Sequence, residues 1–165
     1  MKTITRSNIY LPMAAMILTA AFAVPAAAQK PVPFEGALRG TDKDIGGPDT
    51  AFVVDTSGTG IGTPVGEFSF TQEVAVNLVA GTETGSAHWI AANGDSIYTT
   101  VVGVRAVVDT TRGVITITEI NTITGGTGRF AGAQGSFTVV RVANLVTDAF
   151  SGSFFGTISS PGAAH

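Results

Sequence analysis

The amino-acid sequence predicts an all-β fold, an antiparallel barrel or a sandwich of about eight strands, behind a short N-terminal leader. Two observations favour this fold class. Only 13% of the 165 residues are charged and 44% are hydrophobic, a balance too apolar for disorder and too poor in charge for a coiled coil. The chain also has 21 glycines, which separate short segments of alternating apolar and polar residues, and no long helical period.

The leader has the three parts of a signal peptide. Lys2 and Arg6 supply positive charge, residues 9–24 are apolar and uncharged, and three alanines at 26–28 form a cleavage box. A membrane anchor is the alternative interpretation. The apolar run of 16 residues is shorter than the roughly 20 that a membrane span needs, which favours a removed signal.

We therefore expect residues 1–28 to be a signal peptide and residues 29–165 to form a single β-barrel domain. Cleavage after Ala28 would place the domain in the periplasm or outside the cell, with no stable membrane anchor. The length of the mature chain suits one domain of ordinary size. Loss of the two basic leader residues makes this domain more acidic than the whole chain, which favours solubility.

Composition excludes several function classes. The chain has no cysteine, so it has no disulfide framework, thiol chemistry or cysteine zinc site. A formal net charge of -3 and a pI near 5.2 give no basic surface for nucleic acid. We expect no cofactor and no metal.

The mature chain opens with a proline-rich entry and continues as short segments with strand character. The clearest has apolar residues at even positions, among them Phe68, Phe70 and Val74, and mostly polar residues at odd positions. In order along the chain, the expected strands are 34–39, 51–56, 66–79, 84–91, 96–108, 114–123, 136–142 and 150–158.

The dipeptide Asn93-Gly94 is a strong hairpin signal, because a type I′ turn needs positive φ at both central residues. A two-residue loop there would place Trp89 opposite Tyr98. These two residues are the first candidates for ligand binding, although a cross-strand packing pair is the more common role of two aromatic residues. His88, beside them, has no partner at a catalytic or metal-ligating spacing and is interpreted as structural.

Two glycine-rich runs, residues 125–135 and 58–62, invite comparison with phosphate-binding loops. The first is followed by a strand and lacks the lysine of such a loop. The second has no helix after it and is expected to be a loop between strands. Both runs are interpreted as places of close backbone approach and tight turning.

A symmetrical hairpin centred on Phe130 would place Glu119 opposite Arg141. Apolar neighbours on the same face, such as Ile117 and Val139, suggest the interior and an ion pair at one mouth of the barrel. The alternative, a strand-end pair in solvent, is the favoured interpretation. Glu119 is the only candidate for a catalytic acid or base, and Arg141 is a further candidate for ligand binding.

The residues 91–95 (Ala-Ala-Asn-Gly-Asp), followed by 125–130 (Gly-Gly-Thr-Gly-Arg-Phe), Gly132, Ala133 and Gly135, resemble the allene oxide cyclase and dirigent barrel superfamily. The likeness covers about residues 34–158 and is greatest to small exported bacterial members. It implies an eight-stranded antiparallel barrel with an apolar cavity, often in a homo-oligomer. Plant relatives use such cavities to cyclise an unsaturated epoxy fatty acid or to steer phenoxy-radical coupling.

Three functions remain open at this point. The first is a binding module for a small apolar ligand, lipid-like or phenolic, in the barrel cavity. The second is a cyclase or isomerase acting on such a molecule, an activity that rests on fold analogy alone. The third is a structural or surface-interaction protein without a ligand. An apolar cavity would favour a ligand, whereas a barrel filled by side chains would favour the third function.

Overall fold

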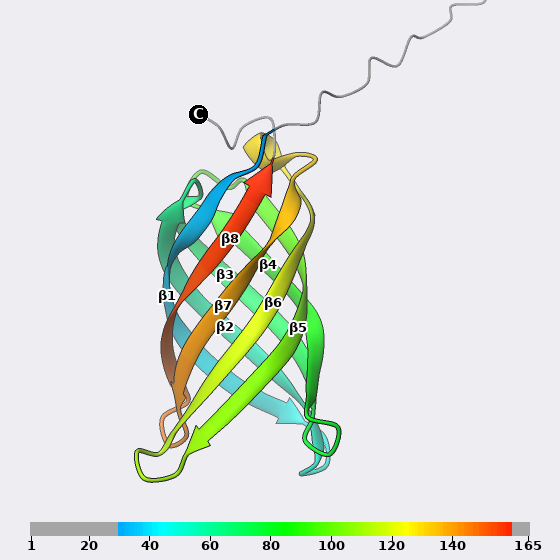
Figure 1. Ribbon diagram of the computed structural model, residues 1–165, viewed down its shortest axis with the longest axis vertical. Helices are drawn as coiled ribbons and strands as arrows, with labels where there is room; N and C mark the ends of the chain where they lie inside the picture. Colours follow the sequence, from blue (N-terminus) through cyan, green and yellow to red (C-terminus); the bar gives the residue numbers. More distant parts are fainter. Residues whose placement is uncertain (1–29, 160–165) are drawn as a thin grey trace, which may run out of the picture.

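Eight strands close into an antiparallel barrel in the computed structural model of the chain, which describes residues 30–159 (Figure 1). Each strand pairs with the next, and β8 pairs with β1. The predicted all-β fold is confirmed, as a barrel and not a sandwich; the predicted signal peptide lies outside the described residues. The elements are β1 (Val32–Gly46), β2 (Ala51–Thr63), β3 (Gly66–Asn77), β4 (Thr82–Ala91), β5 (Ser96–Asp109), β6 (Val114–Gly126), the 3-10 turn η1 (Gly128–Phe130), β7 (Gln134–Asn144) and β8 (Ala149–Ser159).

The eight predicted strands correspond to the eight observed ones, but β1 and β2 extend well beyond their predicted ends, to Gly46 and Thr63. The run 58–62, expected to be a loop, is the second half of β2 and pairs with both β1 and β3. Its inward-facing glycines leave room for aromatic rings. A Cβ at Gly58 would lie 2.7 Å from the Phe70 ring, and one at Gly60 would meet the Phe68 ring. Glycines covered by rings from a neighbouring strand are a known way to curve a sheet, so this run shapes the barrel wall.

One half of the barrel interior is filled by aromatic side chains. We call this half the aromatic end; the β2–β3, β4–β5 and β6–β7 connections lie there. Trp89 is 1% exposed and stacks on Phe70, with ring centroids 5.0 Å apart and planes at 18°. Phe34 meets Phe137 edge to face at 4.8 Å. Phe130 of η1, fully buried, packs into the same core. Such contacts add to the free energy gained by removing the rings from water.

The β4–β5 hairpin differs by one residue from the predicted register. Trp89 lies opposite Ile97, and Tyr98 lies opposite His88. The loop is longer than two residues: the Gly94 amide donates to the Ala91 carbonyl, and the Ala91 amide donates to the Asp95 carbonyl. Positive φ occurs at Gly94, at 89°, but not at Asn93, so the predicted type I′ turn was wrong. A register shift of one residue moves every side chain of a strand to the opposite face of the sheet. Trp89 therefore points inward and Tyr98 points outward.

We expect Gly94→Val to destabilise this hairpin. A β-branched side chain strongly disfavours the positive φ that Gly94 adopts, and the cost is on the order of 1 to 3 kcal/mol. Thermal unfolding measures the loss. Ala92→Val is the matched control, because Ala92 is an exposed residue of the same loop without positive φ. Equal midpoints for the two variants would contradict the turn geometry.

Candidate functional site

The other half of the barrel interior is polar, and we call it the polar end; the β1–β2, β3–β4, β5–β6 and β7–β8 connections lie there. Buried polar side chains from several strands meet in this half, which is uncommon in a protein core. Charged groups buried in this way must be paired, or they shift their pKa and become neutral. The buried members are Thr56, Gln72, Thr99, Glu119, Asn121 and Arg141, each 6% exposed or less.

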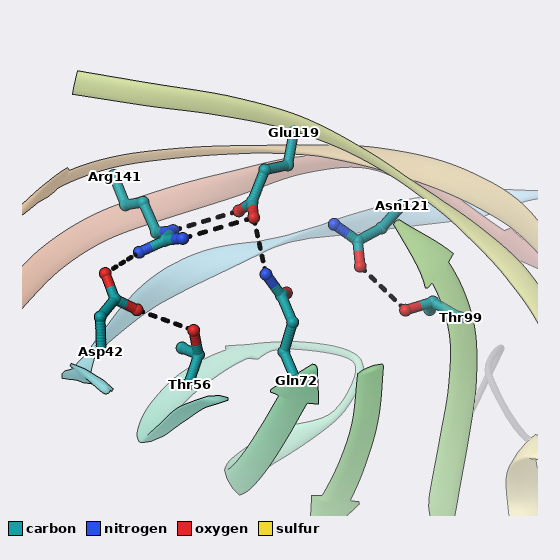
Figure 2. A network of polar contacts seen from close by, with 7 residues as sticks. All are labelled: Asp42, Thr56, Gln72, Thr99, Glu119, Asn121 and Arg141. Atoms are coloured by element: carbon teal, nitrogen blue, oxygen red, sulfur yellow. Dashed lines mark hydrogen bonds and ion pairs between the residues drawn. The ribbon is translucent and has the colours of Figure 1, made fainter. Parts of the chain in front are cut away.

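Arg141 is the central cation of this network (Figure 2). Its Nε lies 3.2 Å from Glu119 Oε2, and its Nη1 pairs with Asp42 Oδ2. The guanidinium also lies over the Phe150 ring, 5.0 Å from its centroid. Burial alone would lower the pKa of Arg141, but the carboxylates of Glu119 and Asp42 outweigh it and hold that pKa above its usual value.

The interior position of this ion pair overturns the favoured sequence interpretation, a pair in solvent. Glu119 is 1% exposed and Arg141 is 3% exposed. Their register also differs from the predicted one by two residues: Glu119 lies opposite Val139, and Arg141 lies opposite Ile117. The pairing is not centred on Phe130, because the last cross-strand pair joins Ile123 to Gly135, whose midpoint is residue 129. A shift of two residues keeps each side chain on its face, so the two still meet diagonally.

Glu119 is held as a carboxylate by three groups. Gln72 Nε2 donates to its Oε1 at 2.6 Å, and Arg141 contacts both of its oxygens. Burial raises the pKa of Glu119, but the Arg141 charge and hydrogen bonds from Glu83, Arg141 and Gln72 lower it below its ordinary value. On the other side of the guanidinium, Thr56 Oγ1 donates to Asp42 Oδ1 at 2.7 Å.

Glu83 of β4 is the acid that the sequence analysis missed. Its side chain is half-buried, and burial raises its pKa to about 8, with a further contribution from Glu119. Protonated Glu83 donates a hydrogen bond to the Glu119 carboxylate, while its Oε1 is buried and has no partner within residues 30–159. Near neutral pH the two carboxyl groups of Glu83 and Glu119 therefore hold one proton between them, and it is bound to Glu83. A long-range cross-barrel contact of this kind has no local sequence signal.

A second polar pair lies beside Glu119. Thr99 Oγ1 donates to Asn121 Oδ1 at 2.8 Å. The amide nitrogen of Asn121 points away from Thr99 in Figure 2, and it is buried without a partner in the described part of the chain. Native proteins leave few buried polar atoms unsatisfied, and those atoms often mark a functional position.

Apolar side chains surround this cluster. Val54, Val76 and Ile115 are half-buried and pack against the core. Val76 lies directly opposite Glu83 in the β3–β4 register, and Val54 lies two residues from Thr56 on β2 and therefore on the same face. The polar end therefore combines hydrogen-bonding groups with an incompletely covered apolar wall.

The aromatic candidates lie elsewhere. Trp89 is enclosed in the aromatic end, and its indole nitrogen is buried without a partner among the described residues. Tyr98 lies on the outer surface, where it stacks on His88 with centroids 4.7 Å apart. The predicted Trp89–Tyr98 pair does not form. Of the three predicted ligand-binding residues, only Arg141 shares a site with Glu119.

Two large grooves are present on the outside of the barrel. The larger, of about 1030 Å³, includes Arg39, Ile61 and Ile90 in its lining. The smaller, of about 680 Å³, crosses β1 to β6 and includes Tyr98. Within residues 30–159, no group of three or more His, Asp or Glu could hold a metal ion. No helix in the same range is long and apolar enough to cross a membrane.

The closed antiparallel barrel has the fold of a dirigent protein. The solved structure of the pterocarpan synthase dirigent protein GePTS1 is similar to it, with a TM-score of 0.57 over 82% of this chain and 87% of that chain. The sequence identity is 10%, so the likeness concerns the fold. No family model and no curated protein matches the chain. The resemblance predicted from the sequence is confirmed at the level of the fold.

Proposed function

We propose that this chain is an exported binding protein for a small, mainly apolar molecule, lipid-like or phenolic, that carries a hydrogen-bonding group. The ligand lies at the polar end of the barrel, because aromatic side chains fill the other half. The observation that carries the proposal is the buried, unsatisfied Oε1 of Glu83 and Nδ2 of Asn121 beside a half-buried apolar wall. Ligand sites commonly combine apolar walls with a few convergent polar groups of this kind.

The test is native mass spectrometry of the protein purified from its own organism, followed by lipid extraction. We expect a small molecule bound one to one, and we expect Val76→Arg to abolish binding, because it places a long cation beside Glu83. Val102→Arg is the matched control, since Val102 is 48% exposed on the outer face of β5. Recovery of the protein without any ligand, or equal effects of the two variants, would favour the structural role instead.

A second candidate function, an acid–base cyclase or isomerase, is favoured by one observation. Glu83 is a protonated acid near neutral pH, and the carboxylate of Glu119 beside it is ionised. Two carboxyl groups whose pKa values are moved apart are suited to donate and accept protons in one reaction. Once the ligand is identified, its conversion separates the two functions. Loss of turnover in Glu83→Gln with unchanged binding supports the enzyme, and a ligand recovered chemically unchanged supports the binding protein.

A further inference from the structure

The smaller outer groove lies across the sheet from the polar end, and Thr56, Gln72 and Thr99 take part in both. Its volume is about 680 Å³, and it crosses strands β1 to β6, of which β2 to β4 form the back wall in Figure 1. The side chains that line it from the outer face are mostly hydroxyl-bearing or charged. A closed barrel has no strand edge there that could bind a peptide by strand addition.

Four hydroxyl-bearing side chains and one histidine form a continuous row across this groove. Thr41, Ser57 and Thr71 lie opposite one another on β1, β2 and β3. The row continues to His88 on β4 and Tyr98 on β5. Neighbouring strands are about 4.8 Å apart, so the row extends over roughly 19 Å. Each hydroxyl both donates and accepts hydrogen bonds, which suits a ligand whose own groups do the same.

A second row lies two residues farther along the strands. Lys43, Asp55 and Glu73 are followed by Ser86 and Thr100 in the same cross-strand order. All but Lys43 present an oxygen that accepts hydrogen bonds, and the two carboxylates outnumber the single cation. The local charge therefore disfavours an anionic ligand.

His88 and Tyr98, the last two residues of the first row, form a stacking surface on the outside of the barrel. Tyr98 is 41% exposed and lies flat on His88, with an interplanar angle of 17°. The Nε2 atom of His88 is buried and has no hydrogen-bond partner within the described residues. An unmet buried polar atom has an energetic cost, and a ligand hydroxyl at the edge of this stack would remove it.

From these features we propose that the outer groove binds a neutral oligosaccharide. Sugar hydroxyls match the two rows of donors and acceptors, and the C–H face of one sugar ring packs on Tyr98. The length of the first row calls for a chain of several sugar units. This site goes beyond the ligand proposed for the barrel interior and does not depend on it.

The test uses the intact exported domain and four neutral probes: cellohexaose, xylohexaose, mannohexaose and chitohexaose. Backbone amide shifts locate the bound sugar, and calorimetry gives the affinity. We expect at least one probe to shift amides of β3, β4 and β5 around His88. We expect Tyr98→Ala to weaken that binding about tenfold or more, which corresponds to roughly 1.4 kcal/mol.

Phe155→Ala is the matched control, because Phe155 is an exposed aromatic residue, 54% exposed, on β8 and outside the groove. It should leave the affinity unchanged, and both variants should keep the unfolding midpoint of the native chain. The proposal is overturned if no probe shifts the groove amides, if the shifts appear only at the polar end, or if Tyr98→Ala binds as tightly as Phe155→Ala. Tighter binding of an anionic oligogalacturonate than of any neutral probe would also overturn it.

Discussion

Arg141→Met should destabilise the barrel by about 3 to 5 kcal/mol at neutral pH. The change removes the cation that pairs with Glu119 and Asp42, and it leaves the Glu119 carboxylate 1% exposed without its main partner. The loss should be smaller in mild acid. Without the guanidinium, the pKa of Glu119 rises under the effect of burial, so protonation then relieves the uncompensated charge.

A double change separates the ion pair from simple packing. Glu119→Gln together with Arg141→Met removes both charges, and the double variant should be more stable than Arg141→Met alone. Arg39→Met is the matched control, because Arg39 is exposed on the outer face of β1 and should change little. Urea unfolding of the native chain, of the Glu119→Gln and Arg141→Met single variants and of the double variant gives the coupling energy. Small, additive effects would mean that the Glu119–Arg141 ion pair contributes nothing to the free energy of unfolding.

The strand pattern could be predicted from the sequence because a half-buried strand shows its two-residue period locally. Residues 66–77 illustrate this, since their buried positions are apolar apart from Gln72 and their outward positions are mostly polar. The glycine run in β2 was misread for a physical reason. Its inner face is filled by Phe68 and Phe70 from the next strand, so the strand carries no apolar period of its own. Only the closed barrel shows that these rings replace the missing side chains.

The registers of the hairpins were less predictable than the strands. At Gly94 one additional loop residue placed Tyr98 on the opposite face of the sheet from Trp89, although the two were expected to share a face. At the 125–135 loop a shift of two residues kept Glu119 and Arg141 on the same face. Glu119 and Arg141 were therefore correctly placed on one face of the sheet, but in the wrong register and, in the favoured interpretation, in solvent. Glu83 escaped prediction because it reaches Glu119 across the barrel, from a strand that is not its neighbour.

The pH dependence of stability should report Glu83 directly. Its pKa is about 8 in the folded chain and about 4.5 in the unfolded one, so between these values the folded state holds a proton that the unfolded state has lost. Stability should therefore fall as the pH rises through this window and level off above it. The limiting slope is about 1.4 kcal/mol per pH unit, and partial exposure of Glu83 reduces the total loss to on the order of 1 to 3 kcal/mol.

Glu83→Gln should abolish this loss, because the amide stays neutral at every pH and fits the same space. The variant should match the native chain in stability near pH ~5 and exceed it near pH ~9 by roughly 1 to 3 kcal/mol. Glu119 does not produce this effect: its lowered pKa contributes stability that is lost only as the pH falls below about 4.5. Glu67→Gln, at an exposed position of β3, is the matched control and should keep the native pH profile. Urea unfolding across this range measures the difference, and parallel profiles for Glu83→Gln and the native chain would show that Glu83 is already ionised in the folded barrel.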